Sequence, residues 1–168
     1  MILKTVKSSQ VEMIELVLPN DTNVLGNLLG GRLMHWIDIA AALAAARHCN
    51  SIAVTAAVDN LVFHHPIKLG NIIRLKASVN RAFNTSMEVG VRVEIEDIKS
   101  GEISHSNSAY LTFVNIDAAT NKPVIVGEIT PETEVEKRRF ESYFSFISSP
   151  KVLSFISLIE PVSYTHLT

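Results

Sequence analysis

The fold of this chain is decided by residues 23–38, which read NVLGNLLGGRLMHWID. A polar loop leads into the pair Gly30 and Gly31, and an alanine-rich apolar segment follows directly. This pattern predicts a helix over about residues 31–48 that is apolar on nearly every side and is therefore surrounded by protein. The helix carries one carboxylate, Asp38, about two turns from its start. A lone carboxylate on an apolar helix is costly to bury unless it has a partner or a function.

The segments on either side of this helix have the pattern of β-strands. One apolar segment precedes the helix, and four segments follow it in which apolar and polar residues alternate with a period of two. Such alternation is typical of an antiparallel sheet with one buried face. We therefore expect an α+β fold in which a curved antiparallel sheet of about five to six strands wraps around one long central helix. The expected strands are 11–18, 52–60, 71–83, 86–97 and 103–116.

Composition limits the classes of protein that the chain can belong to. Its 168 residues, 47% hydrophobic and 19% charged, suffice for one domain with a real core. A formal net charge of −2 gives no reason to expect a nucleic-acid partner, and the longest apolar run is too short to cross a membrane. The single cysteine excludes an internal disulfide, and the first residues lack a signal-peptide pattern. We expect a cytoplasmic protein.

The last third of the chain has a weaker pattern. We expect a single domain over residues 1–127 and a C-terminal extension over residues 128–160 that carries a surface helix. Residues 161–168 read PVSYTHLT and resemble the translation of an adapter used in sequencing libraries. We expect them to be a non-native tail and leave them out of the fold prediction.

The glycine pair and the acid together suggest a catalytic site. Unpaired backbone N–H groups at the start of a helix attract negative charge, and glycine lets a substrate approach them closely. Gly30 and Gly31 are therefore candidate donors to an oxyanion, and Asp38 is a candidate general base or, second, a nucleophile. Three structural alternatives stay open: the glycines begin a tightly packed helix, Asp38 is an interior acid held by hydrogen bonds, and Asn23 caps a turn.

A longer pattern resembles a known family. The segment Asn23-x-x-Gly26-Asn27-x-x-Gly30-Gly31-x-x-Met34-x-x-x-Asp38 resembles the signature of hotdog-fold acyl-CoA thioesterases of the acyl-CoA hydrolase type. The resemblance extends over about residues 11–117. It implies hydrolysis of acyl-CoA to a free carboxylic acid and CoA, with CoA as part of the substrate and no separate cofactor or metal. Further matching segments, in the family's order, are Thr55, Asp59, Phe63-x-x-Pro66-Ile67-x-x-Gly70, Thr85-Ser86-Met87-x-Val89 and Tyr110-Leu-Thr112-Phe113-Val114.

The resemblance also implies an assembly and further site residues. An exposed sheet edge pairs readily with a second copy, so we expect a homodimer or a trimer of dimers. Asn23 would then act with the Asp38 of another copy. For CoA the resemblance indicates Asp59 and Asn60 and the turn at Thr85 and Ser86. Arg81 and Lys76 are further candidates for the CoA phosphates because a cation suits a phosphate group.

Other polar residues and other functions are weaker candidates. His64 and His65 point to opposite faces of an extended segment, so a shared metal is not expected and a connecting role is favoured. His35 is expected to pack structurally, and Cys49 has no neighbouring base. A hotdog hydratase or dehydratase would need a catalytic histidine pattern that the chain lacks. A non-catalytic acyl-CoA binding or regulatory hotdog protein stays open, although no DNA-binding segment is visible.

Overall fold

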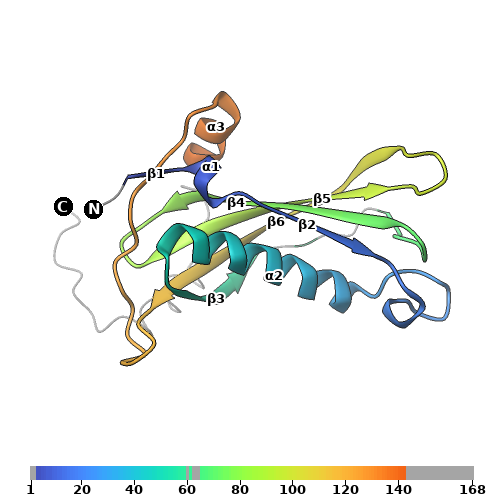
Figure 1. Cartoon of the computed structure of the whole chain (residues 1–168), viewed down its shortest axis with the longest axis horizontal. Coiled ribbons are helices and arrows are strands. Elements are labelled where there is room, and N and C mark those ends of the chain that lie inside the picture. Colours follow the sequence, from blue (N-terminus) through green and yellow to red (C-terminus); the bar gives the residue numbers. More distant parts are fainter. Residues whose placement is uncertain (1–2, 60, 62–64, 143–168) are drawn as a thin grey trace.

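A five-stranded antiparallel sheet forms the body of the computed structural model, which describes residues 3–59, 61 and 65–142 (Figure 1). The strand order is β2-β4-β5-β6-β3, so β2 and β3 are the two edges. The predicted α+β fold is confirmed, and every predicted strand is present close to its expected bounds. The strands are β2 (Val11–Leu16), β3 (Ile52–Val58), β4 (Ile72–Ala82), β5 (Ser86–Glu96) and β6 (Ile103–Ile116).

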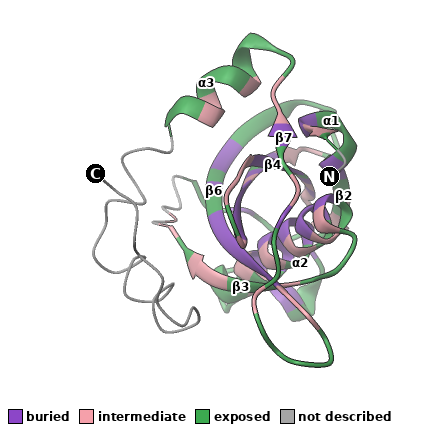
Figure 2. Cartoon of the chain, turned by 90° about the vertical axis from the view of Figure 1, so that its left-hand side faces the viewer, coloured by how far each residue is buried: buried purple, intermediate pink, exposed green. Residues whose placement is uncertain are grey.

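The long helix α2 (Gly30–Cys49) lies in the hollow of the curved sheet, and the end-on view shows the sheet curling around it (Figure 2). It begins at Gly30, one residue before the predicted start. Its sheet-facing side is built largely from alanines such as Ala40, Ala41 and Ala44, which are fully buried. Small side chains let the strands approach the helix closely, as the dense packing of protein interiors requires.

The inner face of the sheet is apolar because alternate residues of neighbouring strands align on it. Ile73, Leu75 and Ala77 of β4 are buried, and each pairs with an apolar residue of β5. The side chains between them point to the other face, where charged residues are frequent. This alternation is the physical basis of the period of two in the sequence.

Short elements near the two ends of the described chain were not predicted from the sequence. β1 (Lys4–Thr5) pairs in parallel with β7 (Ile129–Thr130), and α1 (Val6–Ser9) follows β1. Two-residue strands are too short to show any period, so none of these was expected. A short 3-10 helix, η1 (Pro19–Asp21), lies in the connection between β2 and α2.

One more helix, α3 (Glu134–Ser142), falls within the C-terminal extension. It lies across the outer face of the sheet, on the side opposite to α2 (Figures 1 and 2). The predicted tail at residues 161–168 lies outside the described residues. Within the described part of the chain, no helix is long and apolar enough to cross a membrane.

Candidate functional site

The loop before α2 is a compact turn organised by Asn23. Its side-chain oxygen Oδ1 accepts hydrogen bonds from the backbone N–H of Leu25 (2.9 Å) and of Asn27 (3.2 Å). Gly26 has a φ of +74°, a left-handed conformation that favours glycine. The turn-capping role that the sequence left open for Asn23 is therefore present. Within the described residues the amide nitrogen Nδ2 has no partner, so this group is available as a donor.

This loop is fixed against a second loop and against the helix. Leu28 donates its N–H to the carbonyl of Ile67 (2.7 Å), and Leu69 donates to the carbonyl of Gly26 (2.9 Å). The buried carboxylate of Asp21 pairs with Arg32 in the first turn of α2, with Nε and Oδ1 separated by 2.9 Å. The loop is thus tied on two sides, which places the Asn23 amide in a defined position beside the helix start.

The start of α2 has no side-chain cap. The side chain of its N-cap residue, Leu29, cannot accept a hydrogen bond, so the first N–H groups of the helix depend on other partners. Within the described residues, neither Gly30 nor Gly31 has a recorded acceptor for its N–H. A cavity of about 200 Å³ opens beside this end, lined by Leu28, Gly30, Leu33, His65, Pro66 and Ile67. Of the two predicted donors, Gly30 therefore borders space that a substrate can occupy.

Asp38 is half-buried and contacts the edge strand. The hydroxyl of Thr55 on β3 donates to its Oδ1 at 2.7 Å. Oδ2 has no partner among the described residues, so one oxygen is held while the other is available to accept a proton. The hydrogen bond from the Thr55 hydroxyl is also the contact that the structural alternative, an interior acid held by hydrogen bonds, expects, so that alternative stays open. Thr55 belonged to the family-like pattern, but nothing in the sequence gave it a role.

The donors and the acid of one copy are far apart. Asp38 follows Gly31 by seven positions along the same helix, which at 1.5 Å per residue is about 10 Å along the axis. A thioester carbonyl and its attacking water must contact an oxyanion donor and a general base at the same time, each within hydrogen-bond distance. Along α2 of one copy, the helix start and Asp38 are thus separated by more than a hydrogen-bond distance.

The residues expected to bind CoA gather at one end of the sheet. Arg81 lies opposite Glu88 in the ladder, and Ser86 is buried opposite Val114. The Arg81 guanidinium donates to the carbonyl of Phe140 (3.0 Å) and lies over the rings of Phe83 and Phe140. Asp59 is half-buried, and its N–H donates to Tyr110 (2.9 Å). Asn60 lies outside the described residues, as does His64.

Glu88 is a buried carboxyl group that the sequence reading missed. Its Oε1 accepts from Nδ2 of Asn80 at 2.7 Å. The pKa of Glu88 is raised to about 7, chiefly by burial; the hydrogen bond from Asn80 opposes the rise, the nearby charge of Asp59 adds to it, and the charge of Arg81 opposes it. An alternating strand gives no sign of this, because a polar residue on the outer face is normally expected to meet water.

Cys49 is placed as its structural interpretation expected, whereas His35, which was expected to pack structurally, is exposed. Cys49 is half-buried at the end of α2, and burial raises the pKa of its thiol, which disfavours the nucleophilic thiolate. His35 is exposed on α2. His65 lines the cavity at the helix start, so a role near the substrate stays open for it.

Comparison with known proteins identifies the family. The family model of the thioesterase superfamily matches residues 25–102. The uncharacterized acyl-CoA thioester hydrolase YkhA of Bacillus subtilis is 41% identical over 130 residues, which are 77% of this chain and 75% of YkhA. The chain belongs to the thioesterase superfamily, and the predicted class of enzyme, an acyl-CoA thioester hydrolase, is confirmed.

Solved structures agree with this assignment. An acyl-CoA hydrolase from Staphylococcus aureus, solved with butyryl-CoA, CoA and CoA disulfide, is 33% identical with a TM-score of 0.79, and the match covers 94% of this chain and 92% of that one. A hexameric acyl-CoA thioesterase without ligand is 33% identical with a TM-score of 0.83, over 96% and 100% of the two chains. Further structures of the S. aureus hydrolase carry single alanine replacements of an asparagine, an aspartate or a threonine.

Proposed function

We propose that this chain hydrolyses acyl-CoA with Asp38 as the general base. A water molecule gives a proton to Asp38 while its oxygen bonds to the thioester carbonyl carbon. The C–S bond then breaks, the acid is released, and the proton returns from Asp38 to the sulfur of CoA. The observation that carries this proposal is the Asp38 carboxylate itself, with one oxygen fixed by Thr55 and the other available.

The start of α2 would stabilise the negative charge that develops on the carbonyl oxygen. The N–H groups of Gly30 and Gly31 lie at the positive end of the helix, and Gly30 lines the cavity there. Asn23 contributes as a donor, because its Oδ1 is already occupied by two backbone N–H groups. We therefore assign the Asn23 Nδ2 group to the thioester oxygen rather than to the water.

A complete site requires two copies in this proposal. The separation of about 10 Å between the helix start and Asp38 of one copy is too long for one thioester to bridge. We infer that Asn23 and Gly30 of one copy act with Asp38 of another. The CoA moiety is part of the substrate, and no further cofactor enters the reaction.

The surface beside Asp38 is suited to such pairing. β3 is an edge strand, and its residue Thr55 donates a hydrogen bond to Asp38. Exposed apolar side chains surround this edge, and apolar surface of this extent marks association sites. A dimer formed along this edge brings a second helix start toward Asp38, and the proposal extends to a trimer of dimers. The exposed residues are Ile39, Leu43, Ile52, Val54 and Val58.

The variants of the S. aureus hydrolase add support for the three polar groups. The asparagine, aspartate and threonine replaced in that protein are separated along its chain by the same numbers of residues as Asn23, Asp38 and Thr55. We propose that the three residues of this chain occupy corresponding places. Thr55 is then a positioning residue, because it acts through the Asp38 carboxylate.

Binding of the nucleotide part of CoA is proposed at the end of the sheet that carries Asp59, Asn60, Thr85, Ser86 and Arg81. The Arg81 guanidinium is a cation of the kind that binds phosphate oxygens. The contact with α3 fixes the direction of the guanidinium.

The test is release of free CoA from acyl-CoA substrates of different chain lengths. We expect Asp38→Asn to lower kcat by about 10²-fold or more, the scale of a lost general base, and Thr55→Val to lower it by about 10-fold. Glu102→Gln, which changes an exposed carboxylate in the turn between β5 and β6, serves as the matched control and should behave like the parent.

Unchanged turnover in Asp38→Asn would contradict the proposal. The assay also separates the alternatives. A hydratase would alter an unsaturated acyl chain without releasing thiol, and a binding protein would bind acyl-CoA without turnover in the parent.

A further inference from the structure

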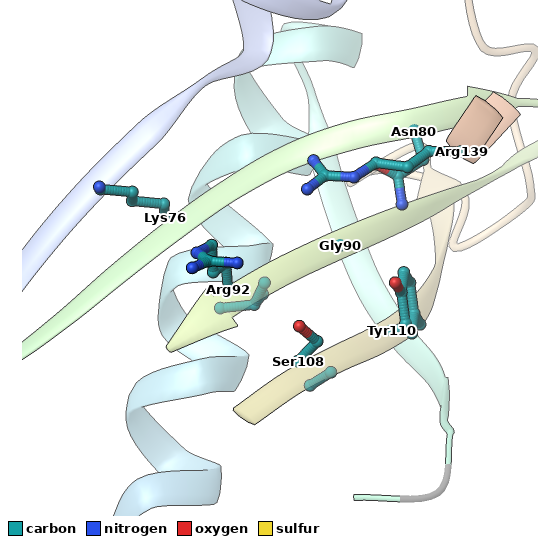
Figure 3. Close-up of a pocket in the computed structure, with 9 residues that line it drawn as sticks. Lys76, Asn80, Gly90, Arg92, Ser108, Tyr110 and Arg139 are labelled. Carbon is teal, nitrogen blue, oxygen red and sulfur yellow. The ribbon is translucent and has the colours of Figure 1, made fainter. Parts of the chain in front are cut away.

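The outer face of the sheet carries a groove that the proposed reaction does not use. Two adjoining hollows share Lys76, Arg92 and Arg139, and the larger has a volume of about 500 Å³. Figure 3 shows the smaller one, with the Arg139 side chain extending from α3 over the strands toward Arg92 and Lys76. The groove is open on the face opposite to α2, so the sheet separates it from Asp38 and the helix start.

Small residues on adjacent strands form the floor of the groove and leave it hollow. Ser78 of β4 lies opposite Gly90 of β5, and Gly90 lies opposite Tyr110 of β6. Gly90 leaves room for the Asn80 side chain, because a Cβ at Gly90 would lie 2.7 Å from Asn80 Nδ2. In the next row, Arg92 lies between Lys76 and Ser108. Hydroxyl groups and cations thus line one open surface.

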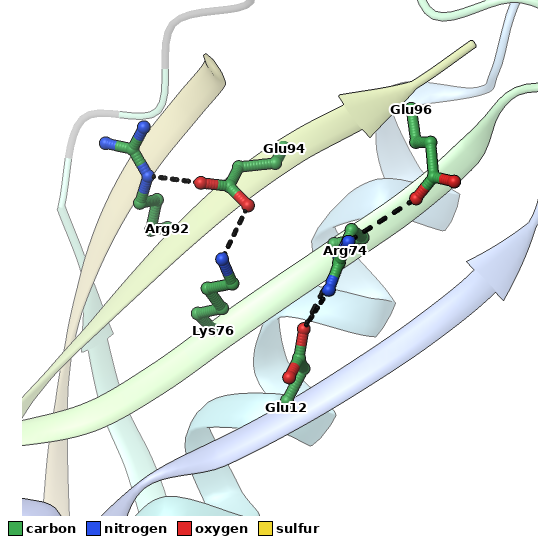
Figure 4. A network of polar contacts seen from close by, with 6 residues as sticks. All are labelled: Glu12, Arg74, Lys76, Arg92, Glu94 and Glu96. Carbon is green, nitrogen blue, oxygen red and sulfur yellow. Dashed lines mark hydrogen bonds and ion pairs between the residues drawn. The ribbon is translucent and has the colours of Figure 1, made fainter. Parts of the chain in front are cut away.

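The cations around the groove exceed the anions. Lys76 and Arg92 share one carboxylate, Glu94, at 2.8 Å each (Figure 4). Together they hold the pKa of Glu94 below its usual range, so it stays ionised. Glu12 also borders the groove, but it pairs with Arg74 at 2.9 Å. Within the described residues Arg139 forms no salt bridge, although its charge lies near the carboxylate of Glu136 on the same helix.

Donors remain available after these pairs are formed. Arg92 uses Nε for Glu94, which leaves both terminal nitrogens of its guanidinium, and Lys76 keeps two of its three N–H groups. Glu94 holds the two side chains in place, so less entropy is lost when a ligand binds. Arg139 adds a third cation from a separate element.

We propose that this groove binds a small anion that carries a phosphate or diphosphate group. The anion lies between Arg139 on one side and Lys76 and Arg92 on the other, and the hydroxyls of Ser78 and Ser108 lie within the same surface. Guanidinium groups bind phosphate oxygens in pairs, and three converging cations favour a dianion over a chloride ion. The diphosphate of CoA and a free phosphate compound share this chemistry.

The test is titration of the full chain with inorganic pyrophosphate by isothermal calorimetry. Arg139→Gln should weaken pyrophosphate binding by about 10-fold, as expected for one charge-assisted contact. Ser108→Asp places a carboxylate beside Arg92 and should abolish it. Arg138→Gln is the matched control, because it removes the same charge from the neighbouring exposed position, which does not line the groove.

Turnover measurements on the same variants distinguish the two sources of the ligand. If the diphosphate of CoA occupies the groove, in place of the site proposed above at Arg81, Arg139→Gln raises the KM for acyl-CoA as well as the Kd for pyrophosphate. If the ligand is a free phosphate compound, only the pyrophosphate Kd changes. Failure of the parent to bind pyrophosphate, or equal weakening by Arg138→Gln and Arg139→Gln, would overturn the proposal. Neither outcome bears on the role of Asp38.

Discussion

The two ends of α2 differ in how their backbone groups are satisfied. The C-terminal end is closed: Asn50 adopts a left-handed conformation with φ of 51°, and Lys4 donates to the carbonyls of Arg47 (2.8 Å) and His48 (2.7 Å). The N-terminal end opens on Gly30 and Gly31 without a side-chain cap, beside a cavity.

This difference indicates that one end of α2 contributes to the stability of the fold and the other to ligand binding. A closed helix end stabilises the fold, because its carbonyls meet a cation and a left-handed cap. An open end forgoes that stabilisation and keeps donors for a ligand. Substitutions at the two ends should therefore separate activity from stability.

The largest effect is expected at the open end. In Gly31→Leu a side chain enters open space, since nothing lies within 4 Å of an added Cβ. We expect kcat/KM for acyl-CoA to fall by about 10²-fold, because the side chain keeps the carbonyl from the N–H groups. The free energy of unfolding should rise by about 0.5 kcal/mol, because leucine favours a helix more than glycine does.

His35→Leu provides the comparison for this substitution. It adds a leucine to another exposed position of α2, about one turn further along. Steady-state kinetics and urea unfolding of both variants should show the loss of activity for Gly31→Leu alone. Equal losses in the two variants would mean that Gly31 has no special place in the site.

The closed end should show the opposite behaviour. Lys4→Met keeps the length of the side chain but removes both charge-assisted bonds to the end of α2, so the free energy of unfolding should fall by about 1–2 kcal/mol. Activity per folded molecule should not change. Urea unfolding at one protein concentration measures the effect, with Lys7→Met, an exposed lysine nearby, as control. A matching loss in the control would contradict the capping role.

The smallest effect is a pH dependence at the same end. His48 is buried, its Nε2 contacts the carbonyl of Gly127 at 2.8 Å, and burial lowers its pKa below the usual 6.5. As pH falls below 6.5, the unfolded chain takes up the proton first, so stability decreases on acidification.

His48→Gln should reduce that pH dependence. The comparison is the change in unfolding free energy between pH 7.5 and 5.5 in the parent and in the variant. Using the difference between the two proteins removes the contribution of Glu88, whose raised pKa acts in the opposite direction over part of this range. An identical change in both proteins would exclude His48 as its source.

The sequence predicted the parts of the fold whose apolar residues follow a regular pattern along the chain. The five strands and α2 follow from alternation and from the apolar run after Gly31, and these were correct. The pairing of β1 with β7 was missed, because two residues on each side hold no pattern and the contact joins distant segments. Such pairing depends on where the rest of the chain places them.

The candidate site was predictable as residue types and not as contacts. Gly30, Gly31 and Asp38 stand out because a helix start without a cap and an acid in an apolar helix are unusual. The hydrogen bond from Thr55 to Asp38 joins a strand to a helix, so no local pattern contains it. The orientation of the Asn23 amide likewise follows from the turn geometry, which only the structure shows.

Mixing two inactive variants tests the central claim, that two copies complete one site. Asn23→Ala and Asp38→Ala are each expected to be nearly inactive. Copies exchanged after mixing in equal amounts should recover about a quarter of the parent's activity, because that fraction of sites combines the intact Asp38 of one variant with the intact Asn23 of the other. Background activity in verified mixed oligomers would contradict the account and place Asn23 and Asp38 in one copy's site.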